Sequence, residues 1–198
     1  MDTSAYLHAL TALFVIIDPI GAALIFNSLT GDSDKRHRTV MAVKAVLISG
    51  VTLILFGNYG EALFGHLGIN INSLRISGGL LLFYTAFNMV TKATGIMSAS
   101  NSDDISVYPM SIPMISGPGT LTLSILLFSH TTELTGKLAV SSAIISILAL
   151  TLVCMLVSKY LKKIIGRTGD EILKRFFGII LAALAIQFIY DGIKNIGF

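Results

Sequence analysis

The chain has 198 residues, of which 54% are hydrophobic and only 13% charged, and its mean hydropathy is +0.81. Because a soluble domain carries about 25% charged residues, this composition excludes a soluble globular protein. It predicts an all-α integral membrane protein whose main partner is the lipid bilayer. The net charge of +3 does not indicate a nucleic-acid partner, since the basic residues gather in short segments between apolar runs and form no continuous stripe.

The first apolar run, residues 7–29, is long enough to cross a bilayer, which requires about 20 residues. An acid, a proline and a glycine interrupt its centre as Asp18, Pro19 and Gly21. A charge at that depth costs between roughly 3 and 10 kcal/mol, and the proline frees backbone groups that lipid cannot satisfy. The sequence therefore predicts a transmembrane helix that is broken near the middle of the membrane.

Further apolar runs predict the second to sixth spans. They cover residues 40–56, 74–90, 110–128, 138–157 and 176–193. A polar linker at residues 98–107 divides the chain into two halves, residues 1–97 and 108–198. The fourth span carries a second break, formed by Ser116, Gly117, Pro118, Gly119 and Thr120. Each half therefore begins with a broken span.

The two halves match each other at corresponding positions. Pro19 recurs as Pro118, and an Arg-x-x-Gly motif that begins at Arg75 recurs at Arg175 with nearly the same offset. Since three spans is an odd number, the second half enters the membrane from the opposite side. The sequence thus predicts two inverted three-helix repeats, the plan of many secondary transporters, with the first and fourth helices broken at mid-membrane.

Basic residues are distributed unevenly over the predicted loops. With six spans, loops one, three and five lie on one side of the membrane. These loops and their margins contain Lys35, Arg36, Arg38, Lys44, Lys92, Lys159, Lys162, Lys163, Arg167, Lys174 and Arg175. The other side has Arg75, Lys137 and Lys194. Because basic loops stay in the cytoplasm, we expect a multi-pass protein of the cell (inner or plasma) membrane with both termini on the non-cytoplasmic side.

The residues at the two breaks suit the start of a half-helix. Asp and Ser are preferred N-caps, and proline is favoured at the first helical position. Asp18 and Ser116 are therefore the predicted caps before Pro19 and Pro118. In an inverted repeat both half-helices begin near the midplane. Their N-termini, each with about half a positive charge and free N–H groups, then face one site.

Two such N-termini favour a carboxylate, and Asp18 adds a negative charge that suits a substrate ammonium group, Na⁺ or a coupling proton. We therefore interpret the site as one for a small zwitterionic amino acid. The predicted substrate-binding residues are Asp18, Pro19, Gly21, Ser116, Gly117, Pro118, Gly119 and Thr120. Apart from a coupling ion, H⁺ or Na⁺, no cofactor is expected. No metal site is predicted beyond Asp18 as a candidate Na⁺ or H⁺ site.

These residues also have purely structural interpretations. Asp18 can cap its own half-helix without any ligand, and glycines let helices pack closely. Arg75, Asn88 and Gln187 are candidates for a polar path or for support of the site, but an interfacial anchor and interhelical hydrogen bonds explain them as well. No catalytic residues are predicted, because the sequence has neither a hydrolase nucleophile arrangement nor a phosphate-binding glycine loop. This argues against an enzyme.

The same segments resemble the MarC family of bacterial and archaeal inner-membrane proteins, in length, six-span layout and motif order. The resemblance covers essentially the whole chain and rests on Ile17–Gly21, Arg75–Gly79, Ile112–Thr120 and Gln187–Gly192. It implies a neutral amino acid transporter related to the LysE-type exporters, with glycine and alanine as typical substrates.

Three functions are therefore compared. The first is an ion-coupled carrier of small neutral amino acids that works by alternating access. The second is a passive channel for small solutes or ions, and the third is a non-transporting membrane scaffold or stress-response protein. Saturable, gradient-dependent flux distinguishes a carrier from a channel, and a scaffold gives no flux. A homo-oligomer is compatible with the sequence, which does not determine the oligomeric state.

Overall fold

The computed structural model describes residues 2–30, 33–91, 104–131 and 133–196. The regular elements in these ranges are all helical, as the composition predicts. They are α1 (Thr3–Ile17), α2 (Pro19–Leu29), α3 (Lys35–His66), α4 (Ile71–Thr91), the π-helical segment η1 (Ser106–Ile115), α5 (Pro118–Ser129), α6 (Leu134–Leu156) and α7 (Ser158–Ile196).

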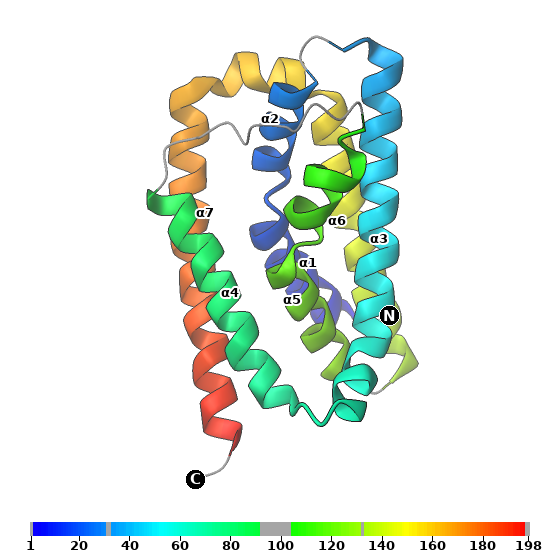
Figure 1. Cartoon of the computed structure of the whole chain (residues 1–198), viewed down its shortest axis with the longest axis vertical. Helices are drawn as coiled ribbons and strands as arrows, with labels where there is room; N and C mark the ends of the chain where they lie inside the picture. The colour runs from blue at the N-terminus through cyan, green and yellow to red at the C-terminus, as the bar shows by residue number, and fades with distance from the viewer. Residues whose placement is uncertain (1, 31–32, 92–103, 132, 197–198) are drawn as a thin grey trace.

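Several helix termini meet at each end of the molecule (Figure 1). At one end, the start of α3 meets the start of α7, where Nη2 of Arg38 donates to the Ser158 hydroxyl at 2.8 Å. At the other end, the start of α4 meets the end of α7, where the Asn72 amide donates to the Asn195 carbonyl at 2.9 Å. We call these the Arg38 end and the Asn72 end.

The elements of the two halves pack on each other in a reciprocal way. α1 and α2 pack against α6, while η1 and α5 pack against α3. In addition, α2 contacts α7 and α5 contacts α4, whereas α3 meets α6 and α4 meets α7. Each broken segment thus lies within the bundle, beside α6 for the first break and beside α3 for the second.

Glycines allow α4 to approach its neighbours closely. A Cβ at Gly79 would lie 2.8 Å from the carbonyl oxygen of Ala185 on α7, and one at Gly178 would lie 2.8 Å from a side-chain atom of α4. A Cβ at Gly78 would collide with Thr122 of α5. Packing is therefore the role of these glycines in the structure, since small residues let membrane helices come together.

Four segments of the described chain are long and apolar enough to cross a membrane, namely Thr3–Leu29, Lys35–His66, Leu134–Leu156 and Glu171–Ile196. A fifth is counted if η1 and α5, which meet at a bend of 56°, form one broken span. α4 is not among them, because Asn72, Arg75 and Asn88 lower the hydropathy of this 21-residue helix. The chain is therefore a multi-pass membrane protein, while the six-span count stays a prediction.

The predicted second and fifth loops differ from the structure. α3 has 32 residues and extends well beyond the predicted span 40–56 at both ends. The basic segment that follows the fifth span is not a loop but the first part of α7, which runs across the Arg38 end before the helix turns along the molecule (Figure 1). Within it Gly166 has φ 64°, a conformation that glycine adopts without steric cost. Lys, Leu, Ile and Arg are adequate helix formers, so the segment stays helical on both sides of Gly166.

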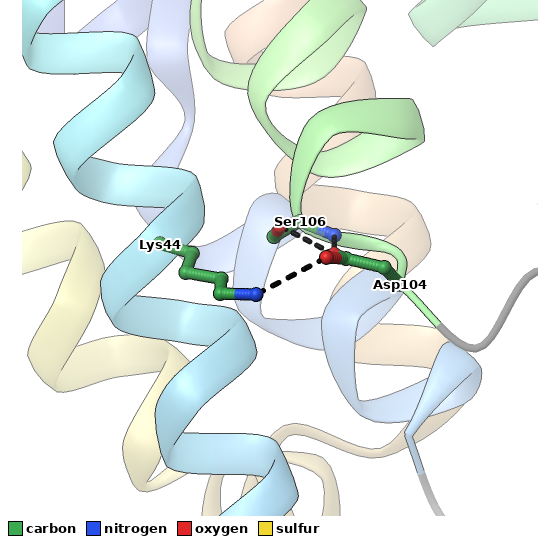
Figure 2. A network of polar contacts seen from close by, with 3 residues as sticks. All are labelled: Lys44, Asp104 and Ser106. Atoms are coloured by element: carbon green, nitrogen blue, oxygen red, sulfur yellow. Dashed lines mark hydrogen bonds and ion pairs between the residues drawn. The ribbon is translucent and has the colours of Figure 1, made fainter.

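The predicted linker at residues 98–107 lies partly outside the described residues, which resume at Asp104. Ser106 already belongs to η1. The Asp104 carboxylate accepts hydrogen bonds from the hydroxyl and the N–H of Ser106 and lies 3.3 Å from Nζ of Lys44 on α3 (Figure 2). The Ser106 hydroxyl, its N–H and then Lys44 hold the pKa of Asp104 down at about 2. The charged carboxylate thereby ties the start of η1 to α3 at neutral pH.

Candidate functional site

The first break separates α1 from α2 at Asp18 alone. Asp18 has the left-handed conformation, φ 47° and ψ 72°, and its N–H ends α1 by donating to the Phe14 carbonyl at 3.1 Å. Its carboxylate begins α2 by accepting the Gly21 N–H at 3.0 Å. Pro19 occupies the first position of α2. The prediction that Asp18 caps a half-helix beginning at Pro19 is confirmed.

Gly21 is buried directly beneath the Asp18 carboxylate. A Cβ at this position would lie 2.9 Å from Cγ of Asp18 and would overlap Oδ2. A larger residue therefore displaces either the carboxylate or the first turn of α2. α6 borders this break, since it packs against both α1 and α2.

The second break is longer and has a different form. η1 contains two non-helical residues, and it ends where the N–H and the hydroxyl of Ser116 both donate to the Ser111 carbonyl, at 2.8 and 2.9 Å. α5 then begins at Pro118 with Gly117 as its N-cap and without a side-chain cap. The prediction that Ser116 caps this half-helix is wrong, because its hydroxyl turns back to close η1.

The two breaks meet inside the bundle. A Cβ at Gly119, in the first turn of α5, would lie 3.4 Å from Cδ1 of Ile16 at the end of α1 and 2.5 Å from Cδ2 of Leu82 on α4. Ile17 and Ile115, which immediately precede the breaks, belong to one buried apolar cluster. Residues that are about 100 positions apart in the sequence are therefore brought into contact by the fold.

Most of the predicted site residues lie in the interior. Pro19, Gly21, Ser116, Gly117, Gly119 and Thr120 are buried and Asp18 is partly buried, whereas Pro118 is exposed. Protein atoms cover the glycines at both breaks. A ligand therefore has no room beside the backbone of these glycines in this conformation.

The starts of α2 and α5 differ in their hydrogen bonding. Asp18 caps α2, while no side chain caps α5. Thr120, in the first turn of α5, is 3% exposed, and its hydroxyl makes no hydrogen bond within the described part of the chain. The start of α5 therefore carries the donors that a small anionic group can use, and the start of α2 carries the carboxylate.

The three residues predicted for a polar path belong to α4 and α7 and not to the two broken segments. Arg75 is at the Asn72 end, where its guanidinium contacts the His130 ring. Gln187 is exposed and donates at 2.9 Å to a carboxylate one turn later on α7. Asn88 is partly buried on α4. No hydrogen bond within the described residues joins any of the three to a break, so their part in a path stays a prediction.

Arg38 is a buried residue that the sequence pattern counts only among the charges of the first loop. It is 6% exposed. Its guanidinium donates to Oδ1 of Asn27 at 3.2 and 3.3 Å, to the Thr30 carbonyl at 3.2 Å and to the Ser158 hydroxyl at 2.8 Å. It also lies 5.6 Å from the centre of the Phe26 ring. No carboxylate pairs with it among the described residues, so neutral groups of α2 and α7 hold a buried charge.

Two cavities of about 260 Å³ each lie at the Asn72 end, and neither is lined by a residue of the two breaks. In the ranges that the structure describes, no group of three or more His, Cys, Asp or Glu side chains is placed to hold a metal ion. The polar groups at the breaks include backbone N–H groups, the Asp18 carboxylate and the Thr120 hydroxyl. These suit the binding of a small polar molecule or an ion.

His130 is the titratable residue that joins the helix ends at the Asn72 end. Nη2 of Arg75 lies 2.9 Å from its Nε2, and because a guanidinium only donates, this nitrogen accepts and carries no proton. Desolvation of the ring and then the charges of Arg75 and His8 lower the pKa of His130 below its usual 6.5, against the opposing carboxylates of Asp191 and Glu61. The contact with Arg75 thus favours the neutral imidazole.

We expect His130 to make the protein less stable in mild acid. Because the folded state favours the neutral ring, the contribution of His130 is fully present above about pH 6.5 and is lost as the pH falls through its lower folded pKa. Thermal unfolding in detergent between pH 8 and 5 measures this. The stability of His130→Gln, which keeps an acceptor for Arg75, should fall less steeply over this pH range than the stability of wild type. Parallel curves for wild type and His130→Gln would contradict the assignment.

Comparison with known proteins adds independent information. The family model described as "MarC family integral membrane protein" matches residues 3–197. A UPF0056 membrane protein of Methanocaldococcus jannaschii is 32% identical over 199 residues, which cover 96% of this chain and 87% of the relative. One of Aquifex aeolicus is 31% identical over 199 residues (96% and 93%), and YvbG of Bacillus subtilis is 32% identical over 204 residues (98% and 97%). No solved structure matches the chain significantly.

Proposed function

The chain belongs to the MarC family of integral membrane proteins, and from this premise we propose that it is a secondary transporter of small neutral amino acids such as glycine and alanine. The substrate binds between the starts of α2 and α5, and a gradient of H⁺ or Na⁺ drives its movement by alternating access. The protein lies in the cell membrane with both termini on the non-cytoplasmic side.

One observation carries this proposal, which is that the start of α5 packs on the end of α1, directly before Asp18 and the start of α2. The start of α2 bears the Asp18 carboxylate, and the start of α5 bears uncapped N–H groups beside the Thr120 hydroxyl. A zwitterion has an ammonium group for the first and a carboxylate for the second. Broken helices in corresponding positions of two halves are also the usual place of the binding site in secondary transporters.

The contacts between elements support two inverted repeats of three spans. In such a repeat α1–α2 corresponds to η1–α5, α3 corresponds to α6, and α4 corresponds to α7. The packing of α1 and α2 on α6 then corresponds to the packing of η1 and α5 on α3. Likewise the contact of α2 with α7 becomes that of α5 with α4, and the pairs α3–α6 and α4–α7 map onto themselves. We therefore include α4 as the third of six spans.

The structure corresponds to a closed state in this proposal, because protein atoms cover the glycines of both breaks. Alternating access requires the α4–α7 pair to separate from the breaks, since Leu82 of α4 packs on Gly119. The buried guanidinium of Arg38 joins α2, α3 and α7 and thereby closes the path at the Arg38 end.

Thr120→Val is expected to raise the KM for alanine by about three- to tenfold, because a hydrogen bond between substrate and the hydroxyl contributes roughly 0.5–1.5 kcal/mol. The substitution preserves the shape of the side chain. Thr122→Val is the matched control, since Thr122 is also buried but its hydroxyl already donates to the Pro118 carbonyl at 2.9 Å. Initial rates of uptake into liposomes measure both. An equal KM for the two variants would remove Thr120 from the site.

Uptake of labelled alanine and glycine into liposomes that contain the purified protein tests the proposed function. A carrier gives uptake that saturates, follows an imposed H⁺ or Na⁺ gradient and increases when unlabelled substrate is present on the opposite side. A channel gives flux that neither saturates in this range nor responds to substrate on the other side. If the folded protein gives no flux under any gradient, the assignment to neutral amino acids is refuted and the scaffold is favoured.

A further inference from the structure

A cavity of about 260 Å³ opens at the Asn72 end, between the last part of α3, the end of α5 and the start of α6. Its lining residues are Gly57, Asn58, Glu61, Phe128, Ser129, Thr131 and Lys137. Since one water occupies about 30 Å³ in the liquid, the cavity has room for roughly eight heavy atoms. A small amino acid fits into this volume.

The two charged residues of this cavity have opposite sign and come from different helices. Glu61 of α3 is exposed and Lys137 of α6 is partly buried. No ion pair within 4 Å joins the Glu61 carboxylate to the Lys137 ammonium in the described part of the chain. Neither side chain makes a hydrogen bond within that part of the chain. A molecule between them can meet both charges at once.

The remaining polar groups of the wall add acceptors. The hydroxyls of Ser129 and Thr131 donate to carbonyls of α5, and the Asn58 amide donates to the Ile54 carbonyl at 2.9 Å. Their oxygen lone pairs therefore stay available to a donor such as an ammonium group. The apolar part of the wall comes from Phe128 and suits a short aliphatic side chain.

We propose that this cavity is a second binding site for a small zwitterionic amino acid, whose ammonium group pairs with Glu61 and whose carboxylate pairs with Lys137. The inference rests on the proposed transport function and adds an outer site to it. α5 connects the two sites, since it begins at the second break and ends in the wall of the cavity. Its 12 residues span about 18 Å at 1.5 Å per residue. A substrate thus waits at the outer site before it reaches the breaks, or rests there after leaving them.

Calorimetric titration of the purified full-length protein with alanine tests this site, with uptake into liposomes measured in parallel. Wild type should bind two alanine molecules. Glu61→Gln and Lys137→Gln should each weaken one of the two sites by about tenfold, the effect of losing one charge-assisted hydrogen bond. The exchanged pair Glu61→Lys with Lys137→Glu should restore it. N-acetylalanine, which lacks the ammonium group, and alaninamide, which lacks the carboxylate, should not occupy it.

Glu133→Gln is the matched control, because Glu133 is an exposed carboxylate at the start of α6 that does not line the cavity. A single bound alanine in wild type, or two sites of unchanged affinity in Glu61→Gln and Lys137→Gln, would overturn the outer site while normal uptake left the transport function standing. Neither binding nor uptake of alanine by folded wild type would overturn both.

Discussion

Gly21→Ala is expected to abolish most transport and to lower the free energy of unfolding by about 1–3 kcal/mol, the usual cost of an extra methyl group in a packed interior. The new Cβ would overlap the Asp18 carboxylate. Either the carboxylate then leaves the Gly21 N–H, or the first turn of α2 shifts. The first alternative alone costs about 1 kcal/mol, the value of an N-cap hydrogen bond. Both alternatives displace the Asp18 carboxylate, whose position the proposed site requires.

Gly65→Ala is the control for this prediction, because a Cβ at Gly65 of α3 meets no atom within 4 Å. Alanine uptake into liposomes and thermal unfolding in detergent are measured for both variants. If Gly21→Ala transports and unfolds like Gly65→Ala, the arrangement of Asp18 over Gly21 does not exist in the protein in its membrane.

Arg38→Met is expected to lower the free energy of unfolding by at least about 2 kcal/mol, since a hydrogen bond to a charged group contributes roughly 1.5–3 kcal/mol. Methionine fills much of the space of the arginine stem but leaves Oδ1 of Asn27, the Thr30 carbonyl and the Ser158 hydroxyl without the guanidinium. These groups are buried, so water replaces the lost donor poorly.

Arg36→Met removes the same charge two residues earlier, at an exposed position of the first turn of α3. It should leave thermal unfolding in detergent nearly unchanged. Equal loss of stability in the two variants would mean that the effect comes from the net charge of this end and not from the buried hydrogen bonds of Arg38.

The first break could be predicted from the sequence because local chemistry determines it. Asp followed by Pro and, two residues later, Gly is an N-cap sequence that needs no tertiary contact to be recognised. The structure places Asp18 and Pro19 as predicted. It also explains why residue 21 is a glycine, because the Asp18 carboxylate lies where a Cβ would be. The sequence alone does not show this.

The second break could not be predicted in detail, because two acceptors compete for one hydroxyl. Ser116 has the side chain of an N-cap, but the Ser111 carbonyl at the end of η1 takes its hydrogen bond, and Gly117 becomes the cap instead. η1 itself is irregular and contains Pro109 and Pro113. Such a segment has no periodicity from which its form could be recognised.

Two other differences between prediction and structure have separate causes. Arg38 looks like a loop charge in the sequence, since its partner Ser158 follows 120 residues later. The basic segment at the start of α7 looks like a loop because its charges interrupt the apolar pattern, yet its residues are helix formers and Gly166 supplies the turn. Hydropathy indicates candidate spans, but it does not reveal which polar residues become buried.

The most direct test of the central claim is the uptake of alanine by Asp18→Asn, compared with wild type in the same liposomes. Asparagine is an equally good N-cap and tolerates the left-handed conformation, so the variant removes the charge and keeps the break, which unchanged thermal unfolding verifies. If the Asp18 charge serves substrate or ion, uptake driven by the ion gradient falls to the level of empty liposomes. If uptake is equal to that of wild type, Asp18 is only a cap, and the substrate does not bind between the two half-helices as proposed.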